Sequence, residues 1–295
     1  MEPAGIGVSS ISRDSSGRPV LEFASQTDCL LADGCEGTLI EIVKRKSLHN
    51  SRCNVILSSN SYQLSQANIA ELPEGERRDA ARWQIGERID YPPEEAVVDL
   101  YEVAPYGSEK MPLVYVVSAQ QRLLRDRIKL AEASGLVLEA IDIPEFALRN
   151  VCDLFTEDER GLAILLLLEQ SGVLVIVRDG TLYLVRWLNS GMNDLIPYAE
   201  DIEVLTEQLD TIVLEIQRSF DYCESTFHLP LVSRLLIAQT QQEIPAVVSY
   251  LNDYLTVPVA SFSFENVLTV PEGSTQIDLN RCLIAIGGAL RQGNH

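Results

Sequence analysis

Short apolar runs bounded by turn residues predict strands at the start of both halves of the chain. The polar segment 13–18 lies between two such runs, and its Asp, Ser and Gly residues suit a turn. Asp179-Gly180, between two later runs, is a strong signal for a tight hairpin. We therefore expect strands at residues 5–11, 19–24, 162–168, 173–177 and 182–187, so that a β-hairpin opens each half.

Apolar residues recur at intervals of three and four in other segments, and this repeat is typical of amphipathic helices. The longest series runs from Ile202 to Phe220. Ile143-Pro144 starts a further helix, because proline is tolerated in a first helical turn. The other expected helices lie near residues 38–46, 74–89, 119–134, 243–254 and 279–291. Further strands are expected near residues 55–57, 97–103, 113–117, 235–238 and 257–259.

The order of these elements predicts an α/β protein of two lobes. Two halves that each open with a hairpin and continue with helix and strand favour an actin-like arrangement, in which the lobes face each other across a cleft. The first lobe is expected at residues 1–160, with a small inserted α+β subdomain at about 62–142, and the second at 161–292. Residues 293–295 follow the end of a helix and are interpreted as the remnant of a purification tag.

Composition narrows the classes of partner and compartment. With 46% hydrophobic residues, the chain can bury a sizeable core. Its net charge of −20 repels phosphate backbones, so nucleic acid is not expected as a partner. No apolar run approaches the roughly 20 residues that a membrane span needs, and no signal segment is recognisable. We therefore expect a cytoplasmic protein without a membrane span of its own.

Cysteine and histidine usage predicts neither disulfides nor a metal site. The six cysteines form no CxxC pair, and Cys152 and Cys282 lie inside apolar runs, so buried free thiols in a reducing compartment are expected. His49, His228 and His295 are scattered along the chain, which argues against a zinc site.

Several longer segments resemble the PilM and MshI family of pilus-assembly proteins. They are Glu71-Leu72-Pro73 through Ala80-Ala81-Arg82-Trp83-Gln84, Tyr91-Pro92 with Glu94 to Asp99, Ile141 to Asn150, Leu214 to Tyr222, and Ala285 to Arg291, and together they extend over nearly the whole chain. The resemblance implies an actin-like fold of the FtsA/PilM type. It leans toward MshI of the MSHA-type pilus because of Trp83-Gln84, because no membrane-spanning run is expected, and because of the nucleotide motifs described below.

The same resemblance implies a function as an adaptor. It suggests a cytoplasmic adaptor that binds the cytoplasmic N-terminal tail of a PilN-like bitopic protein and so associates peripherally with the inner membrane. It also suggests the pilus assembly ATPase as a second partner. The tail is expected between the inserted subdomain and the first lobe.

The nucleotide motifs of actin-like ATPases are degenerate in this chain. Each hairpin of such an enzyme carries an Asp that organises magnesium, but Gly7 stands at that position in the first hairpin and Leu168 or Glu169 in the second. The expected Gly-Gly turn for adenosine is missing from the segment 236–245. We therefore expect no cofactor and no ATP hydrolysis. The alternative is an ATP-binding switch or weak ATPase with Mg-ATP, whose residual candidates are Gly7, Ser9, Ser10, Glu169, Ser171 and Gly172.

Trp83 is the candidate anchor for a partner. Ala81, Ile85 and Ile89 form an apolar stripe on the helix near 74–89, and Trp83 points to nearly the opposite side. Either this helix is covered on two sides, or Trp83 is a binding hot spot for a partner peptide. In the second interpretation the binding residues are Trp83, Ala80 and Glu87.

Three smaller features complete the interpretation. Trp187 is expected to pack in the core. The cations Arg122, Arg125, Arg127 and Lys129 form either a solvated helix face or a surface for a membrane or an acidic partner. Gly287-Gly288 inside the last apolar helix indicates close packing against another backbone.

Overall fold

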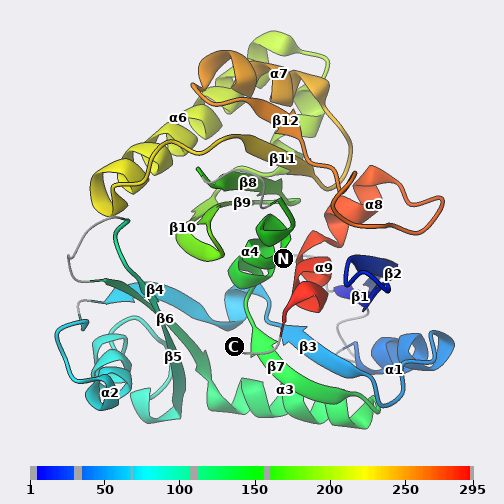
Figure 1. Cartoon of the computed structure of the whole chain (residues 1–295), viewed down its shortest axis with the longest axis vertical. Helices are drawn as coiled ribbons and strands as arrows, with labels where there is room; N and C mark the ends of the chain where they lie inside the picture. The colour runs from blue at the N-terminus through cyan, green and yellow to red at the C-terminus, as the bar shows by residue number, and fades with distance from the viewer. Residues whose placement is uncertain (1–4, 30–34, 68, 107–111, 156–159, 293–295) are drawn as a thin grey trace. The chain divides into compact units, whose positions relative to one another are not determined.

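The computed structural model describes residues 5–29, 35–67, 69–106, 112–155 and 160–292 (Figure 1). The chain forms two compact units: a larger unit of residues 1–35 with 145–295, and a smaller unit of residues 36–144. The lobe boundary near residue 160 and the inserted subdomain at about 62–142 stay predictions. The suggested tag remnant at 293–295 lies outside the described residues.

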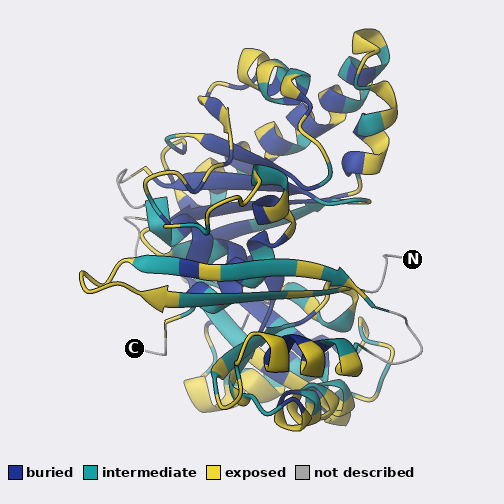
Figure 2. Ribbon diagram, turned by 90° about the vertical axis from the view of Figure 1, so that its right-hand side faces the viewer, coloured by how far each residue is buried: buried dark blue, intermediate teal, exposed yellow. Residues whose placement is uncertain are grey.

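The core of the larger unit is a five-stranded sheet in the order β10-β9-β8-β11-β12. Strands β8, β11 and β12 run parallel, and β9 and β10 are antiparallel to their neighbours. The sheet residues are among the most buried in Figure 2, as expected for near-continuous apolar strands covered on both faces. The strands are β8 Leu162–Leu167, β9 Gly172–Arg178, β10 Thr181–Leu188, β11 Leu235–Gln239 and β12 Val259–Ser261.

Helices cover both faces of this sheet. Helices α6 and α7 lie on one side, and α4 and α9 lie on the other (Figure 1). The 26-residue α6 begins after Asp201, whose side chain accepts a hydrogen bond from Val204 N–H, and ends at His228, which has a left-handed backbone. The helices of this region are α4 Pro144–Cys152, α5 Met192–Leu195, α6 Ile202–Phe227, α7 Pro245–Tyr254, α8 Gln276–Arg281 and α9 Leu283–Leu290.

The first hairpin belongs to the larger unit. Strands β1 (Gly5–Arg13) and β2 (Pro19–Asp28) pair antiparallel. On the β2 side, Leu21 N–H donates to the carbonyl oxygen of Thr269 at 2.8 Å. The hairpins predicted at both halves are therefore confirmed, including the turn at Asp179-Gly180, where both residues have positive φ.

The described residues of the smaller unit form two separate sheets and three α-helices. Its three-stranded antiparallel sheet has the order β4-β6-β5, and β3 pairs parallel with β7. Ala81 and Ile85 of the predicted apolar stripe pack with Val114 and Val116 in its core. The elements are α1 Glu36–Arg45, β3 Arg52–Ile56, β4 Gln63–Ala67, α2 Glu74–Gln84, β5 Ala96–Val103, β6 Leu113–Gln120, α3 Gln121–Ala133 and β7 Val137–Asp142. Short 3₁₀ helices lie in the smaller unit at η2 Ser59–Ser61 and η3 Pro93–Glu95, and in the larger unit at η4 Asp153–Phe155 and η5 Ile196–Tyr198.

Three of the predicted elements differ from the structure for a local physical reason. The helix predicted to reach residue 89 ends at Gln84, where Gly86 N–H bonds to the carbonyl of Trp83 in a tighter turn. The single helix predicted at 279–291 is two helices, α8 and α9, separated at Cys282. The strand predicted at 257–259 begins only after Pro258, which has no N–H to donate to a sheet.

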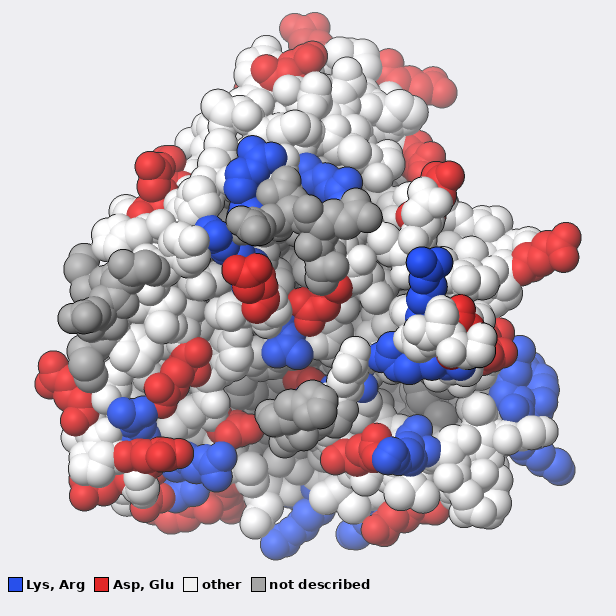
Figure 3. All heavy atoms as spheres, viewed as in Figure 1, with Lys and Arg blue, Asp and Glu red and all other residues white. Residues whose placement is uncertain are grey.

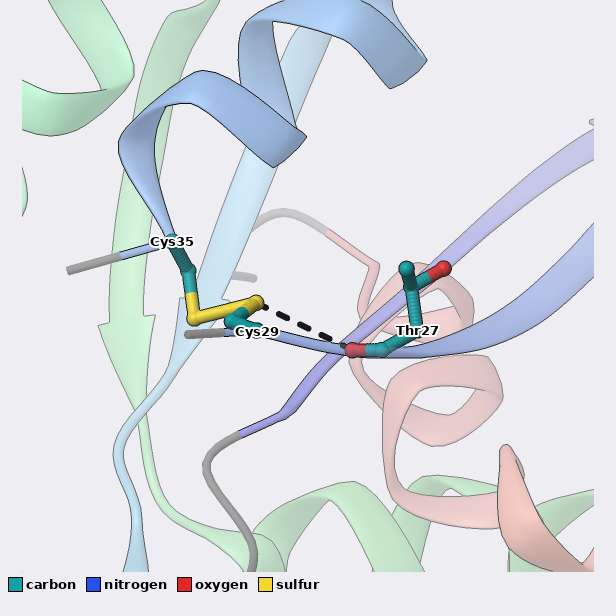
Figure 4. Close-up of a disulfide and its surroundings, with 3 residues drawn as sticks. All are labelled: Thr27, Cys29 and Cys35. Carbon is teal, nitrogen blue, oxygen red and sulfur yellow. Dashed lines mark hydrogen bonds between the residues drawn. A yellow bond between two sulfur atoms is a disulfide. The ribbon is translucent and has the colours of Figure 1, made fainter. Parts of the chain in front are cut away.

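The prediction that all cysteines are free is wrong for one pair. Cys29 and Cys35 form a disulfide that links the end of β2 to the start of α1 (Figure 4). Their sequence spacing lacks any recognised pairing motif, so only the folded chain brings the two sulfurs together. Cys152, Cys223 and Cys282 are buried free thiols, as expected, and Cys53 is a half-buried one. Burial raises the pKa of the Cys282 thiol to about 11, which keeps it protonated and unreactive at neutral pH.

Among the described helices, none combines the length and the apolar character that a membrane span requires.

Candidate functional site

The turn between β8 and β9 carries the second set of nucleotide-site candidates. Leu168 N–H donates to the carbonyl oxygen of Ser171 at 2.8 Å, which closes the turn around Glu169 and Gln170. The start of α5 packs behind it, because Met192 N–H and Asn193 N–H donate to the carbonyl oxygens of Leu168 and Glu169 at 2.7 and 2.9 Å. Two acceptors of the turn are therefore already occupied by the chain's own backbone.

Gly191 permits this close packing. A Cβ atom on Gly191 would lie 2.4 Å from the backbone nitrogen of Ser171 and 2.6 Å from the carbonyl carbon of Gln170, closer than real Cβ atoms come. The residue before Met192 therefore has to be glycine for the turn and α5 to touch. Sequence reasoning missed Gly191, although a glycine between a predicted strand and a polar segment is a signal for close backbone approach.

At the end of β11, actin-like ATPases would carry an adenosine-binding Gly-Gly turn. In this chain, polar side chains at that end form hydrogen bonds with other parts of the protein. Thr240 Oγ1 donates to the carbonyl oxygen of Leu167 at 2.8 Å. The buried Gln239 accepts from Ile244 N–H through its side-chain oxygen at 3.0 Å. Its carbonyl oxygen accepts from Asn280 Nδ2 at 2.9 Å. The carboxyl ends of parallel strands are where α/β proteins usually bind ligands, and here these groups stabilise the protein itself.

Asn280 was also missed from the sequence. It is buried on α8 beside Cys282, where α8 ends, and its side chain bonds to the β11 strand end and accepts from Gln276 Nε2 at 2.8 Å. A polar residue in a predicted apolar helix is the one signal that could have revealed it, because a buried amide needs partners.

The first hairpin presents two of its candidates, Gly7 and Ser9, to α9. Ser9 Oγ donates to the carbonyl oxygen of Ala285 at 2.7 Å, so this hydroxyl holds the hairpin to the last helix. A Cβ atom on Gly7 would lie 2.8 Å from Oε1 of Gln26, and an aspartate there would have to displace that side chain. Ser10 is half-buried in β1 opposite Phe23.

The two sets of nucleotide-site candidates are not bonded to each other. Among the described residues, no hydrogen bond or ion pair joins Gly7, Ser9 or Ser10 to the turn at 168–172. In the same part of the chain, no group of three or more His, Cys, Asp or Glu side chains is arranged to hold a metal ion. The hydrogen bonds show structural uses for Ser9 and Thr240.

The α2 surface of the smaller unit is different, because its largest side chain is mostly exposed. Trp83 is 67% exposed, and both the interpretation in which α2 is covered on two sides and the one in which Trp83 binds a partner stay predictions. Ala80, one helical turn earlier, is half-buried against the core of the smaller unit. Glu87 lies exposed beyond the end of α2. Trp83 and Ala80 thus share a helix, and Glu87 belongs to the turn that follows it.

Charged side chains of both signs lie near Trp83 on this surface. Asp79 lies one helical turn before it and Glu76 two turns before it, and both are exposed. Asp79 is paired with Arg82 at 2.7 Å, and Arg82 Nε also donates to the carbonyl oxygen of Ala96 at 3.2 Å, which fixes α2 to β5. An exposed indole beside Glu76, a carboxylate that forms no ion pair with a described residue, suits a segment that carries both apolar and cationic residues.

Trp187 and the four cations of α3 belong to none of the sets of candidate residues described above. Trp187 is half-buried, and its Nε1 donates to the carboxylate of the fully buried Glu145 at 2.9 Å, which agrees with a packing role. Arg122, Arg125 and Lys129 on α3 are exposed and Arg127 is half-buried, and none of the four forms an ion pair with a described residue. The choice between a solvated face and a binding surface for these cations stays open.

Gly287 has the structural role that the sequence predicted. A Cβ atom on this residue would lie 2.1 Å from the backbone oxygen of Ala147, so α9 and α4 touch backbone to backbone (Figure 1). Asn150 Nδ2 on α4 donates to the carbonyl oxygen of Gly287 at 3.0 Å. This glycine therefore permits the close packing of α9 on α4.

Comparisons with known proteins come from structure alone. No protein-family model matches the chain, and no curated protein matches its sequence at a significant level. A chain of a solved "PilM-PilN type IV pilus biogenesis complex" is similar with a TM-score of 0.75 and 18% identity, over 98% of this chain and 95% of that chain.

Two further solved structures are more distant. A Bacteroides thetaiotaomicron protein of unknown function with an actin-like ATPase fold has a TM-score of 0.47 and 9% identity, over 94% of this chain and 95% of that chain. The cytoplasmic domain of EpsL, an inner membrane component of the type II secretion system of Vibrio cholerae, has a TM-score of 0.46 and 10% identity, over 94% of this chain and 93% of that chain. The likeness to the PilM-PilN structure extends over nearly all of both chains and confirms the α/β, actin-like fold predicted from the sequence.

Proposed function

We propose that this chain is a non-catalytic adaptor of a type IV pilus assembly platform, and that it binds the cytoplasmic tail of a PilN-like inner-membrane protein. The observation that carries the proposal is the likeness, over 98% of this chain, to a chain from a complex that contains PilM and PilN. In this account the protein works in the cytoplasm and reaches the inner membrane through its partner. The finer assignment to MshI of an MSHA-type pilus rests on the sequence resemblance, as does the pilus assembly ATPase as a second partner.

Trp83 supports the binding part of the proposal. An indole with 67% of its surface exposed loses apolar contact with water when a peptide covers it, and tryptophan is enriched among the residues that dominate binding energies. Cytoplasmic segments next to a membrane span are rich in Lys and Arg, and Glu76 and Glu87, which are exposed and form no ion pair with a described residue, offer carboxylates to such a segment. We therefore assign the tail to the α2 surface defined by Trp83, Ala80 and Glu87.

The non-catalytic part of the proposal is supported by the residues at the nucleotide motifs. Gly7 has no carboxylate to orient a magnesium-bound water. Ser9 Oγ and Thr240 Oγ1 donate to backbone carbonyls of the chain itself. A nucleotide would have to replace these bonds, and an unpaired buried carbonyl left behind would oppose its binding.

We expect millimolar Mg-ATP to produce no saturable increase in melting temperature and no release of phosphate. The physical reason is that a ligand raises the melting temperature only if it binds the folded state better than the unfolded chain. The measurement is a thermal-shift titration with ATP and with ADP, paired with a phosphate-release assay, and an active actin-like ATPase serves as the positive control in the same buffer.

A saturable shift that is lost in Glu169→Gln would contradict the non-catalytic assignment and favour an ATP-dependent switch. Ser249→Ala serves as the control, because Ser249 is exposed on α7 and lies outside the nucleotide motifs. This variant should behave like the native chain in both assays.

A further inference from the structure

Helix α6 has an uncovered face opposite the one that packs on the sheet. Its buried residues, among them Leu205, Leu209 and Ile216, face the core of the larger unit. On the other side, six exposed positions follow one another at steps of four, three, four, three and four residues, which places them along one line of the helix. We call this line the α6 seam; it consists of Glu203, Glu207, Asp210, Leu214, Gln217 and Asp221.

An apolar and aromatic patch lies at the centre of the seam. Leu214 is 45% exposed, and Tyr254 at the end of the adjacent α7 is 57% exposed. Gln217 Nε2 of the seam donates to the carbonyl oxygen of Tyr254 at 3.2 Å, so the two helices meet at this point. The exposed parts of this leucine and this tyrosine give an occupant apolar surface to bury.

The tyrosines of this patch are held in place before any partner binds. The rings of Tyr250 and Tyr254 are stacked with their centroids 4.4 Å apart. Tyr250 Oη donates to Asp210 Oδ1 of the seam at 2.6 Å, and this bond, together with the negative charge of Asp210, raises the pKa of the tyrosine. Side chains that are already ordered lose less conformational entropy on binding.

The negative charge of the seam favours an occupant with positive charge. Among the described residues, no Lys or Arg forms an ion pair with Glu203, Glu207, Asp210 or Asp221, and the neighbouring Arg218 is paired with Glu215. Glu203 and Glu207 are four residues apart and Glu207 and Asp210 are three apart, so these like charges repel one another along the helix. On the face drawn in Figure 3, acidic side chains also gather at the top, over α7 and the adjoining end of α6.

We propose that the α6 seam and the Tyr250–Tyr254 pair form a second docking surface, which binds a cationic amphipathic segment of another protein. Lys or Arg side chains of that segment relieve the repulsion along the seam and lie against the tyrosine rings, whose faces attract cations. An apolar side chain of the segment covers Leu214. This surface belongs to the larger unit and shares no residue with the α2 surface, so it does not depend on the proposed function.

The test uses the full chain and a fluorescein-labelled synthetic peptide of lysine, leucine and alanine that forms an amphipathic helix. Fluorescence anisotropy measures its affinity at low and at physiological salt. We expect saturable binding that weakens with salt, and no binding of peptides in which Glu replaces Lys or Ser replaces Leu.

Paired variants distinguish specific binding at the α6 seam from general electrostatic attraction of the peptide to an acidic protein. Leu214→Ser should weaken binding at least about fivefold, whereas Leu231→Ser, equally exposed outside the seam, should leave it unchanged. Glu207→Gln with Asp221→Asn should weaken binding by a similar factor. The charge-matched pair Glu265→Gln with Glu272→Gln, exposed elsewhere in the larger unit, should change it less than about twofold.

Circular dichroism and melting curves confirm that each exposed variant is folded. No saturable binding, equal effects of the two charge pairs, or normal binding by folded Leu214→Ser would each overturn the proposal.

Discussion

Replacing Gly287 by alanine is expected to lower the free energy of unfolding by about 3 kcal/mol, at the upper end of the usual cost of overpacking a core. The new Cβ atom would lie 2.1 Å from the backbone oxygen of Ala147. Because the obstacle is backbone and not the end of a flexible side chain, α9 and α4 would have to separate. Separation would also lengthen the bond from Asn150 Nδ2 to the carbonyl oxygen of Gly287. Urea unfolding followed by circular dichroism measures the effect.

Gly75→Ala on α2 is the matched control for this substitution. A Cβ atom on Gly75 would meet nothing within 4 Å, so alanine there should leave stability unchanged or raise it by up to about 1 kcal/mol. If Gly287→Ala were as stable as the native chain, the close contact between α4 and α9 would be refuted.

Replacing Trp83 by alanine is expected to weaken binding of a PilN-like tail at least about tenfold. A short peptide buries little surface, so one aromatic anchor carries a disproportionate share of the affinity, on the order of 2 kcal/mol. Because Trp83 is 67% exposed, the substitution should leave the fold intact. Isothermal titration calorimetry with a synthetic tail peptide gives the affinity, and circular dichroism and melting curves report on the fold.

Two variants control for general effects of losing an apolar side chain. Val97→Ala removes a 42% exposed residue from β5 of the same unit and should not change the affinity. Trp187→Phe alters the other tryptophan, which bonds to Glu145 in the larger unit, and should reduce stability more than binding. A folded Trp83→Ala protein that binds the tail normally would show that the α2 surface is not the docking site.

The elements that sequence predicted well are those whose signal is local. Asp179-Gly180 forms a hairpin because both residues tolerate positive φ, and α6 follows from a repeat of apolar residues that meets one sheet face. The close approach at Gly287 was predicted for the same reason, since glycine inside an apolar helix is costly without a contact that requires it.

The features that sequence missed depend on contacts between distant segments. Asn280 bonds to the end of β11, 41 residues earlier, and the helix predicted through this region is interrupted at Cys282. The Cys29–Cys35 disulfide has no motif that distinguishes it from two free thiols. For Trp83, helical spacing placed the side chain off the apolar stripe but could not decide whether another part of the chain covers it. The candidate nucleotide residues could be located from their positions in the sequence motifs. The hydrogen bonds of Ser9 and Thr240 to distant backbone carbonyls could not be predicted, because they depend on the folded structure.

The most direct test of the account is a titration of the wild-type chain with the cytoplasmic N-terminal peptide of a PilN-like protein, with and without Mg-ATP. A scrambled peptide of the same composition separates recognition from charge attraction. A non-catalytic adaptor binds the tail in a saturable way with the same affinity in both conditions, because no nucleotide takes part in the docking surface. Absence of binding by the tail, or binding that requires Mg-ATP, would contradict the account.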